Sequence, residues 1–99
     1  MRYKIAAMIQ SFKCAATQSL FSGNAVARWV NIRQVAERKL QMLHRAVVLA
    51  DLLIPPGNRL EKLSGDRAGQ WSIRVNSQWR VCFVWRDGHA WDVEIVDYH

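Results

Sequence analysis

The C-terminal part of the chain alternates apolar and polar residues with the two-residue period of half-buried β-strands. Three runs show this period: residues 70–75, 79–85 and 91–95. The residues predicted to face a core are Trp71, Ile73, Val75, Trp79, Val81, Phe83, Trp85, Trp91, Val93 and Ile95. The residues between them, Arg80 among them, are predicted to face the other way.

Short turn signals separate these three runs. Asn76-Ser77-Gln78 suits a tight turn between the first two. Asp87-Gly88 gives the strongest hairpin signal in the chain, because Gly accepts the positive φ that a two-residue turn needs. Strands joined by turns this short run antiparallel. The sequence therefore predicts an antiparallel meander of three strands with an aromatic-rich inner face.

The middle of the chain has the period of an amphipathic helix instead. From about residue 25 or 28 to residue 49 or 51, apolar residues recur at spacings of three and four. This stripe consists of Trp29, Ile32, Ala36, Leu40, Leu43, Val47 and Ala50, and the far side carries Arg38, Gln41 and Arg45. The stripe predicts one long helix that covers the sheet.

Two further segments flank this helix. Residues 15–22 predict a short helix ended by Gly23-Asn24, residues suited to a left-handed C-cap. Pro55-Pro56 ends the long helix, because proline lacks the backbone donor. The connection Pro55–Gly69 that follows is long enough to suggest function. The predicted fold class is α+β, with helices packed on one face of an antiparallel sheet.

The charge of the chain is high and unevenly distributed. The 99 residues suit a single domain and carry a net charge of +6, with 51% hydrophobic residues. Residues 1–50 hold eight basic residues against one acidic residue, Glu37, whereas residues 51–99 hold six against seven. A basic domain of this size favours nucleic acid as its partner. A solvated basic surface with no such partner is the alternative.

Several chemistries lack their sequence signals. No glycine-rich phosphate loop precedes a helix, no serine sits in a nucleophile elbow, and the histidines and cysteines show no zinc-site spacing. Cys14 and Cys82 are predicted to be buried thiols in a reducing cytoplasm, and no stretch suits a secretory signal or a membrane span. An enzyme of this composition would need no metal or cofactor. Its Arg, Lys, Tyr, His and carboxylate groups fit RNA cleavage through the ribose 2′-hydroxyl.

Three segments carry a resemblance to a known family: GDRAGQWSIRVNSQWRVCF, the upstream PPGNRLEKL and the terminal VDYH. Together they resemble the HigB-type toxins of bacterial toxin-antitoxin pairs, within the RelE/ParE superfamily. The likeness begins at Met8, so residues 8–99 are expected to form one RelE-like domain and residues 1–7 a frayed extension. It also implies a short first strand at residues 9–13.

The resemblance implies a function and a set of partners. It implies a ribosome-dependent, metal-independent mRNA endonuclease that works in the ribosomal A site without a cofactor and arrests translation in the cytoplasm. It implies inhibition by a HigA-type antitoxin with a helix-turn-helix domain, and contact with operator DNA through that antitoxin alone. The expected partners of the active toxin are then the 70S ribosome and mRNA, and no membrane is involved.

The resemblance also assigns catalytic residues. A strand arginine such as Arg80 is otherwise more often solvated or salt-bridged, but in these toxins the matching arginine contacts the scissile phosphate. Asp97, Tyr98 and His99 match the terminal Asp-Tyr-His of the family's active site. Without the resemblance they would read as a frayed end. In this assignment Tyr98 orients or deprotonates the 2′-hydroxyl, and His99 protonates the leaving oxygen.

The loop before the first meander strand departs from the family pattern. Ser64 stands where many relatives carry lysine, and Glu61 where some carry histidine. A serine supplies no positive charge near a phosphate. Lys62 is predicted to substitute for the missing lysine, and Arg59 and Arg67 add cations to the same substrate-binding segment.

Two other classes of function remain possible on the sequence. A ParE-like protein of the same fold would bind and inhibit DNA gyrase without cleaving anything, although the terminal Tyr98-His99 counts against a pure binder. A basic DNA-binding module is the third class. The apolar stripe of the long helix leaves no exposed recognition helix for it.

Overall fold

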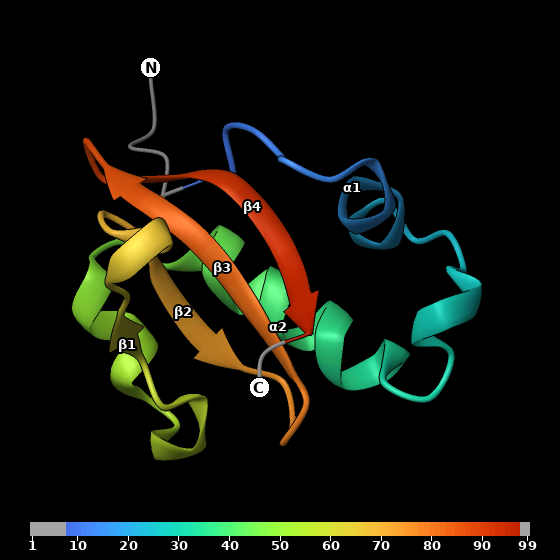
Figure 1. Cartoon of the computed structure of the whole chain (residues 1–99). Coiled ribbons are helices and arrows are strands. Elements are labelled where there is room, and N and C mark those ends of the chain that lie inside the picture. The colour runs from blue at the N-terminus through green and yellow to red at the C-terminus, as the bar shows by residue number, and fades with distance from the viewer. Residues whose placement is uncertain (1–7, 98–99) are drawn as a thin grey trace.

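The computed structural model describes residues 8–97, so the expected N-terminal extension 1–7 and the candidate residues Tyr98 and His99 lie outside the described residues. The helices are α1 (Ala15–Phe21) and α2 (Arg33–Arg45), and the strands are β1 (Glu61–Lys62), β2 (Trp71–Arg74), β3 (Trp79–Arg86) and β4 (His89–Asp97) (Figure 1). The strands form one antiparallel sheet in the order β1-β2-β3-β4. The α+β class predicted from the sequence is confirmed.

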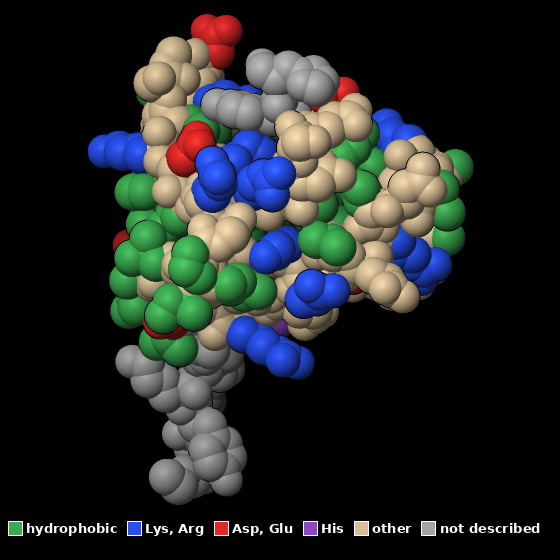
Figure 2. All heavy atoms as spheres, turned by 90° about the horizontal axis from the view of Figure 1, so that it is seen from below, with side chains coloured by type: hydrophobic (Ala, Val, Ile, Leu, Met, Phe, Trp, Pro, Cys, Tyr) green, Lys and Arg blue, Asp and Glu red, His purple; other side chains and the backbone are tan. Residues whose placement is uncertain are grey.

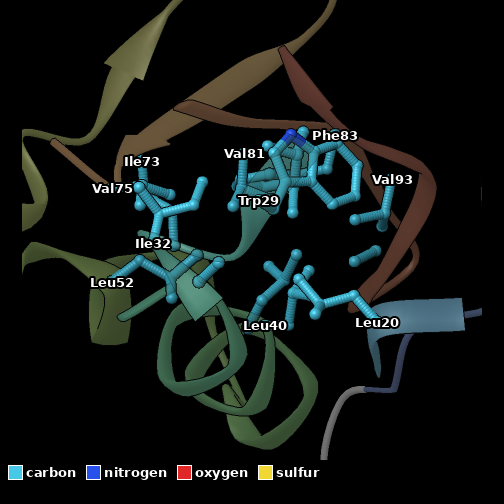
Figure 3. Close-up of a cluster of buried hydrophobic side chains, with 14 of the residues drawn as sticks. Leu20, Trp29, Ile32, Leu40, Leu52, Ile73, Val75, Val81, Phe83 and Val93 are labelled. Atoms are coloured by element: carbon cyan, nitrogen blue, oxygen red, sulfur yellow. The ribbon is translucent and has the colours of Figure 1, made fainter. Parts of the chain in front are cut away.

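The core lies between the helices and one face of the sheet. Figure 3 shows side chains from the helical half meeting side chains from the strands in a single cluster. Its fully buried members include Leu20, Leu40, Leu43, Leu52, Ile73, Val81, Phe83 and Val93. Burying one such side chain stabilises the fold by roughly 1.5–3 kcal/mol. The core therefore fixes which face of each strand meets the helices.

The long helix is shorter than predicted at both ends. Residues Ala27–Trp29 form a separate 3-10 turn, and α2 ends at Arg45 because Ala46 adopts an extended conformation (φ −63°, ψ 134°). The Asp51 carboxylate then accepts the backbone N–H groups of Val47 and Val48, at 2.8 and 3.2 Å. This cap redirects the chain into a 3-10 helix, Leu49–Leu53.

The predicted apolar stripe is consequently wrong beyond Leu43. Val47 and Ala50 are exposed, and Ala46 is buried in their place. Val47 joins three other exposed aliphatic side chains of the segment after α2: Val48, Leu53 and Ile54. Figure 2 shows hydrophobic side chains gathered at the left of the face seen from below, on the side of the molecule where Figure 1 draws this segment.

The N-terminal strand expected at residues 9–13 is present only as two isolated parallel bridges, Ile9↔Ala90 and Phe12↔Val93. The segment lies along β4 and makes backbone hydrogen bonds to it, including Gln10 N–H to the Ala90 carbonyl at 2.7 Å. Between the bridges, the Ser11 hydroxyl accepts the Asp92 N–H at 2.8 Å. This side-chain contact stands where a regular ladder would have a backbone pair.

A β-bulge at Asp92 overturns the predicted orientation of Trp91. Asp92 has a positive φ of 53°, and the pairing of β3 with β4 shifts register between Cys82 and Val84. Trp91 therefore pairs with Val84 and faces away from Val93, not with it as the alternation predicted. Its indole N–H donates to the Arg86 carbonyl at 3.2 Å, and the Arg86 guanidinium lies 4.5 Å from the ring centroid.

Both predicted turns are confirmed. Asp87 and Gly88 have φ of 56° and 76°, the two positive values of a type I′ hairpin turn. In the other turn, the Asn76 side-chain oxygen accepts the N–H groups of Gln78 and Trp79, each at 2.8 Å. The prediction missed β1, which lies inside the connection Pro55–Gly69. Its two residues, Glu-Lys, carry no strand signal of their own.

Candidate functional site

The face of the sheet opposite the core carries a cluster of polar side chains, which we call the polar face. Alternation and register place on it Glu61 of β1, Ser72 of β2, Arg80 and Cys82 of β3, and Glu94 of β4. Ser72 is the common neighbour, since it pairs with Glu61 on one side and Cys82 on the other. The side chains therefore converge from all four strands.

Arg80 is at the centre of the polar face and is only 7% exposed. Its Nε donates to the Ser72 hydroxyl at 2.7 Å, and its Nη2 donates to the Arg59 carbonyl at 2.6 Å. Nη2 also lies 3.8 Å from the Glu61 carboxylate. A buried guanidinium needs such partners, because an uncompensated charge away from water is costly. These contacts hold the guanidinium in one orientation.

Two of the predicted substrate-binding residues, Arg59 and Arg67, contact residues of the polar face. Arg59 has an exposed side chain, while its carbonyl holds Arg80. Arg67 is bound within the protein, since its Nη2 lies 3.3 Å from a Glu94 oxygen and its Nη1 donates to Gln70 at 3.1 Å. Lys13 approaches the second oxygen of Glu94 at 3.8 Å. The Arg67–Glu94 pair fastens the 3-10 turn Gly65–Arg67 to the sheet.

The other two predicted loop residues lie away from Arg80's contacts. Lys62 is exposed and pairs with Trp71, so the register puts it on the opposite side of the sheet from Glu61. Ser64 is exposed at the start of the turn Gly65–Arg67, and its carbonyl accepts the Arg67 N–H at 3.2 Å. The residue that the sequence puts in place of a histidine, Glu61, is thus the loop side chain that the fold brings to Arg80.

Asp97 lies at the end of β4, opposite Trp79 in the register. Its side chain is exposed and accepts a hydrogen bond from the Gln78 amide at 3.1 Å. By strand alternation it is on the Trp79 side of the sheet, whereas Arg80 pairs with the preceding residue, Val96. The described residues therefore do not bring the Asp97 carboxylate beside Arg80.

Glu61 is the site residue that sequence reasoning did not select. Half of its side chain is exposed, and it is 3.8 Å from Arg80. Glu94, the other carboxylate of the polar face, is 16% exposed and engaged by Lys13 and Arg67. An accessible carboxylate beside a fixed guanidinium can accept a proton while the cation binds an anion. Its position opposite Ser72 depends on β1, which the sequence did not predict.

The two cysteines differ from each other. Cys82 is fully buried on the polar face, as predicted, and burial raises the pKa of its thiol, so it stays protonated at neutral pH. Cys14 is only partly buried, contrary to the prediction, because it precedes α1 at an edge where its sulfur lies 3.8 Å from Arg28. Neither belongs to a cluster of three metal-ligating side chains within residues 8–97.

No helix within the described part of the chain is long and apolar enough to cross a membrane.

The exposed basic residues of α2 lie on the side predicted from the sequence. Arg38 and Arg45 line an open groove of about 320 Å³ together with Gln41, Met42, Ala46 and Asp51. Figure 2 shows Lys and Arg side chains over the same face as the exposed aliphatic ones.

The fold is shared with toxins that bind a partner protein. Two structures of a YoeB-YefM complex from Staphylococcus aureus match with a TM-score of 0.55, over 98% of this chain and 99% of theirs. The identities are 17% and 18%, so this likeness establishes the α+β fold alone.

Residues 10–99 match the family described as the RelE-like toxin of type II toxin-antitoxin system HigB. The Endoribonuclease HigB of Proteus vulgaris is 35% identical over 98 residues, which span 93% of this chain and 100% of that protein. Toxin HigB-1 of Vibrio cholerae serotype O1 is 50% identical over 60 residues, which span 61% of this chain and 63% of that protein. The chain belongs to the HigB family of type II toxins. These matches give no support to the ParE-like alternative.

Beneath the segment that leads to β1, Lys39 of α2 is buried and donates to the side-chain oxygen of Asn58 at 2.5 Å. Burial lowers the pKa of the Lys39 ammonium below its ordinary value, and the nearby charge of Arg38 acts in the same direction. The folded chain therefore releases this proton at a lower pH than the unfolded chain does. The charge on Lys39 opposes folding.

A pH dependence of stability follows from this pKa. Between the folded pKa and the ordinary value of 10.5, the unfolded state binds more protons, so the Lys39 contribution to stability increases as the pH rises. We expect the unfolding free energy of the protein, minus that of Lys39→Met, to increase across this alkaline window in urea titrations. Lys62→Met, which removes an exposed lysine, is the control. The prediction would be contradicted if the difference in unfolding free energy from the wild type changed with pH by the same amount for Lys39→Met and Lys62→Met.

Proposed function

We propose that this HigB toxin is a ribosome-dependent, metal-independent endoribonuclease that cleaves mRNA and so inhibits translation. The observation that carries the proposal is the fixed guanidinium of Arg80, next to an accessible carboxylate, in a chain related over its length to a protein named Endoribonuclease HigB. Such a pair has the chemistry that attack on a phosphodiester requires. The proposed cytoplasmic setting and the single domain 8–99 follow from the same family membership.

The proposed reaction is attack of the ribose 2′-oxygen on the scissile phosphorus. A base removes the 2′-hydroxyl proton, the new P–O bond forms, and the bond to the 5′-oxygen breaks as an acid protonates that oxygen. Arg80 neutralises the charge that develops on the phosphorane. Tyr98 orients the 2′-hydroxyl, His99 is the acid, and Asp97 supports them at the terminus. These three roles rest on the family resemblance.

Glu61 is the proposed base. It lies on the polar face, half exposed and 3.8 Å from Arg80, so that one substrate can contact both side chains. A carboxylate is a weak base at neutral pH, so the enzyme depends on exact placement of the RNA. The ribosome supplies that placement in this proposal, which accounts for ribosome dependence.

The substrate and ribosome contacts are proposed from charge and exposure. The exposed side chains of Arg59 and Ser64 lie on the loop beside the polar face, and Arg67 is at its edge, paired with Glu94. The exposed Lys62 lies on the other side of the sheet. Arg38 and Arg45 of α2 are exposed on the opposite layer, where they can meet ribosomal RNA phosphates. Phosphate contacts of this kind make binding strongly dependent on salt.

The antitoxin partner is proposed to be of the HigA type, with a helix-turn-helix domain that binds operator DNA. The toxin would then reach that DNA through the antitoxin alone. The family is defined by its toxin-antitoxin system, and the structures that share the fold are of a toxin in complex with a second protein. Co-expression of the toxin with the product of an adjacent reading frame, followed by purification, tests this partner.

Arg80→Ala tests the proposed function. Removing a guanidinium that meets transition-state charge should lower the rate of mRNA cleavage on programmed ribosomes roughly a hundredfold or more, by analogy with the loss of one oxyanion donor. Arg86→Ala is the matched control, because Arg86 is an exposed arginine at the far end of the same strand. Both variants are checked for folding by circular dichroism and for antitoxin binding. A folded Arg80→Ala protein with full activity would show that Arg80 is structural.

Glu61→Gln tests the proposed base. The amide keeps the size of the side chain but cannot accept the 2′-hydroxyl proton, so the chemical step should slow roughly a hundredfold or more. Glu37→Gln removes a carboxylate that pairs with Arg33 on α2 and serves as the control. Single-turnover cleavage separates the chemical step from ribosome binding. An unchanged or faster rate in Glu61→Gln would mean that the carboxylate only neutralises Arg80.

A further inference from the structure

Asn58 is a fully buried polar residue in the segment that joins α2 to β1. Its side-chain oxygen accepts the Lys39 ammonium at 2.5 Å. Its amide nitrogen is 3.1 Å from the Leu52 carbonyl and 3.5 Å from that of Ile54. One side chain thus ties helix α2 to two backbone groups of the segment, and buried hydrogen bonds of this kind specify a single backbone conformation.

The residue after Asn58 holds Arg80. Arg59 adopts a left-handed conformation (φ 45°, ψ 58°), which is uncommon for a side chain other than glycine, and its carbonyl accepts Arg80 Nη2 at 2.6 Å. The direction of this carbonyl depends on the backbone that Asn58 fixes. Arg80 Nε is held separately by Ser72. The guanidinium is therefore held by Ser72 of the sheet, through its hydroxyl and its carbonyl, and by the segment that Asn58 anchors.

We propose that Asn58 is a positioning residue for Arg80, acting through the Arg59 carbonyl, and that Lys39 supports it from α2. This deepens the proposed function and rests on it for the effect on catalysis. The contact chain runs from α2 through Lys39, Asn58 and the Arg59 backbone to the guanidinium. Loss of the Asn58 amide lets the segment before β1 relax, and the Arg59 carbonyl then no longer directs Nη2.

The proposal separates the two parts of Arg59. Its carbonyl positions Arg80, whereas its exposed side chain takes no part in that positioning. Arg59→Gly keeps the carbonyl, and glycine adopts a positive φ without strain. We expect this variant to keep the wild-type orientation of Arg80, whereas KM rises because a surface charge is missing.

The test compares Asn58→Ala with Thr17→Val. Thr17 is also fully buried and accepts one backbone hydrogen bond, from Ile95 at 3.0 Å, so its replacement is a destabilising control that does not touch the path to Arg80. The first readout is the NMR signal of the Arg80 Nη–H groups and their exchange with solvent, because Nη2 is the atom that the Arg59 carbonyl holds. The second is kcat and KM for cleavage on programmed ribosomes.

In Asn58→Ala the Arg80 Nη–H groups should exchange with solvent at least several-fold faster than in the wild type. Its kcat should fall roughly ten- to a hundredfold with little change in KM, because the guanidinium is displaced. Thr17→Val should change neither. If Asn58→Ala does not fold, Asn58→Asp, which keeps an acceptor for Lys39 but loses the amide donors, is measured in the same way.

The exchange and kcat measurements on the Asn58 variants test the positioning proposal and the proposed function separately. Wild-type exchange of the Arg80 Nη–H groups in a folded Asn58 variant would overturn the positioning proposal, whatever happens to activity. Faster exchange with an unchanged kcat would uphold the positioning of Arg80 and overturn its proposed role in catalysis. The NMR readout thus tests the inference independently of the proposed function.

Discussion

The burial of the Arg80 guanidinium is the constraint on which the polar face depends. Taking such a charge out of water costs roughly several kcal/mol unless hydrogen bonds and an opposite charge compensate. The sheet itself provides the Ser72 hydroxyl. Further compensation comes from the Arg59 carbonyl and the Glu61 carboxylate, both of which belong to the segment around β1. Two residue pairs with β2 hold part of that segment against the sheet.

The two faces of the sheet have different roles: one stabilises the fold, and the other carries the candidate functional side chains. One face of the sheet is covered by the helices and filled with aliphatic and aromatic side chains, which supply the hydrophobic stabilisation. The other face carries a cation, two carboxylates and a hydroxyl brought together from four strands. Glu61 of β1 presents a carboxylate to Arg80, and this carboxylate is the proposed base.

Local patterns predicted much of this structure, and the exceptions have specific causes. The two-residue period predicted β2 and β3, and Asp87-Gly88 predicted the hairpin turn from β3 to β4. Each of these signals lies within a few neighbouring residues. Trp91 was misplaced because a bulge at Asp92 inverts the alternation, and Val47 because the Asp51 carboxylate redirects the chain. The sequence could nominate Arg80. It could not show that Glu61 lies beside it while Lys62 faces the other way, since β1 forms only by pairing with β2.

The account is tested most directly by cleavage of mRNA on programmed ribosomes with the full-length chain and with a chain that ends at Asp97. The proposal that Tyr98 and His99 complete the site predicts codon-phased breaks with the full-length protein. The shortened chain, shown to be folded by circular dichroism, should cleave roughly a hundred- to ten-thousandfold more slowly, as expected when a general acid is lost. A folded, shortened chain that cleaves as fast as the full-length one would contradict the account.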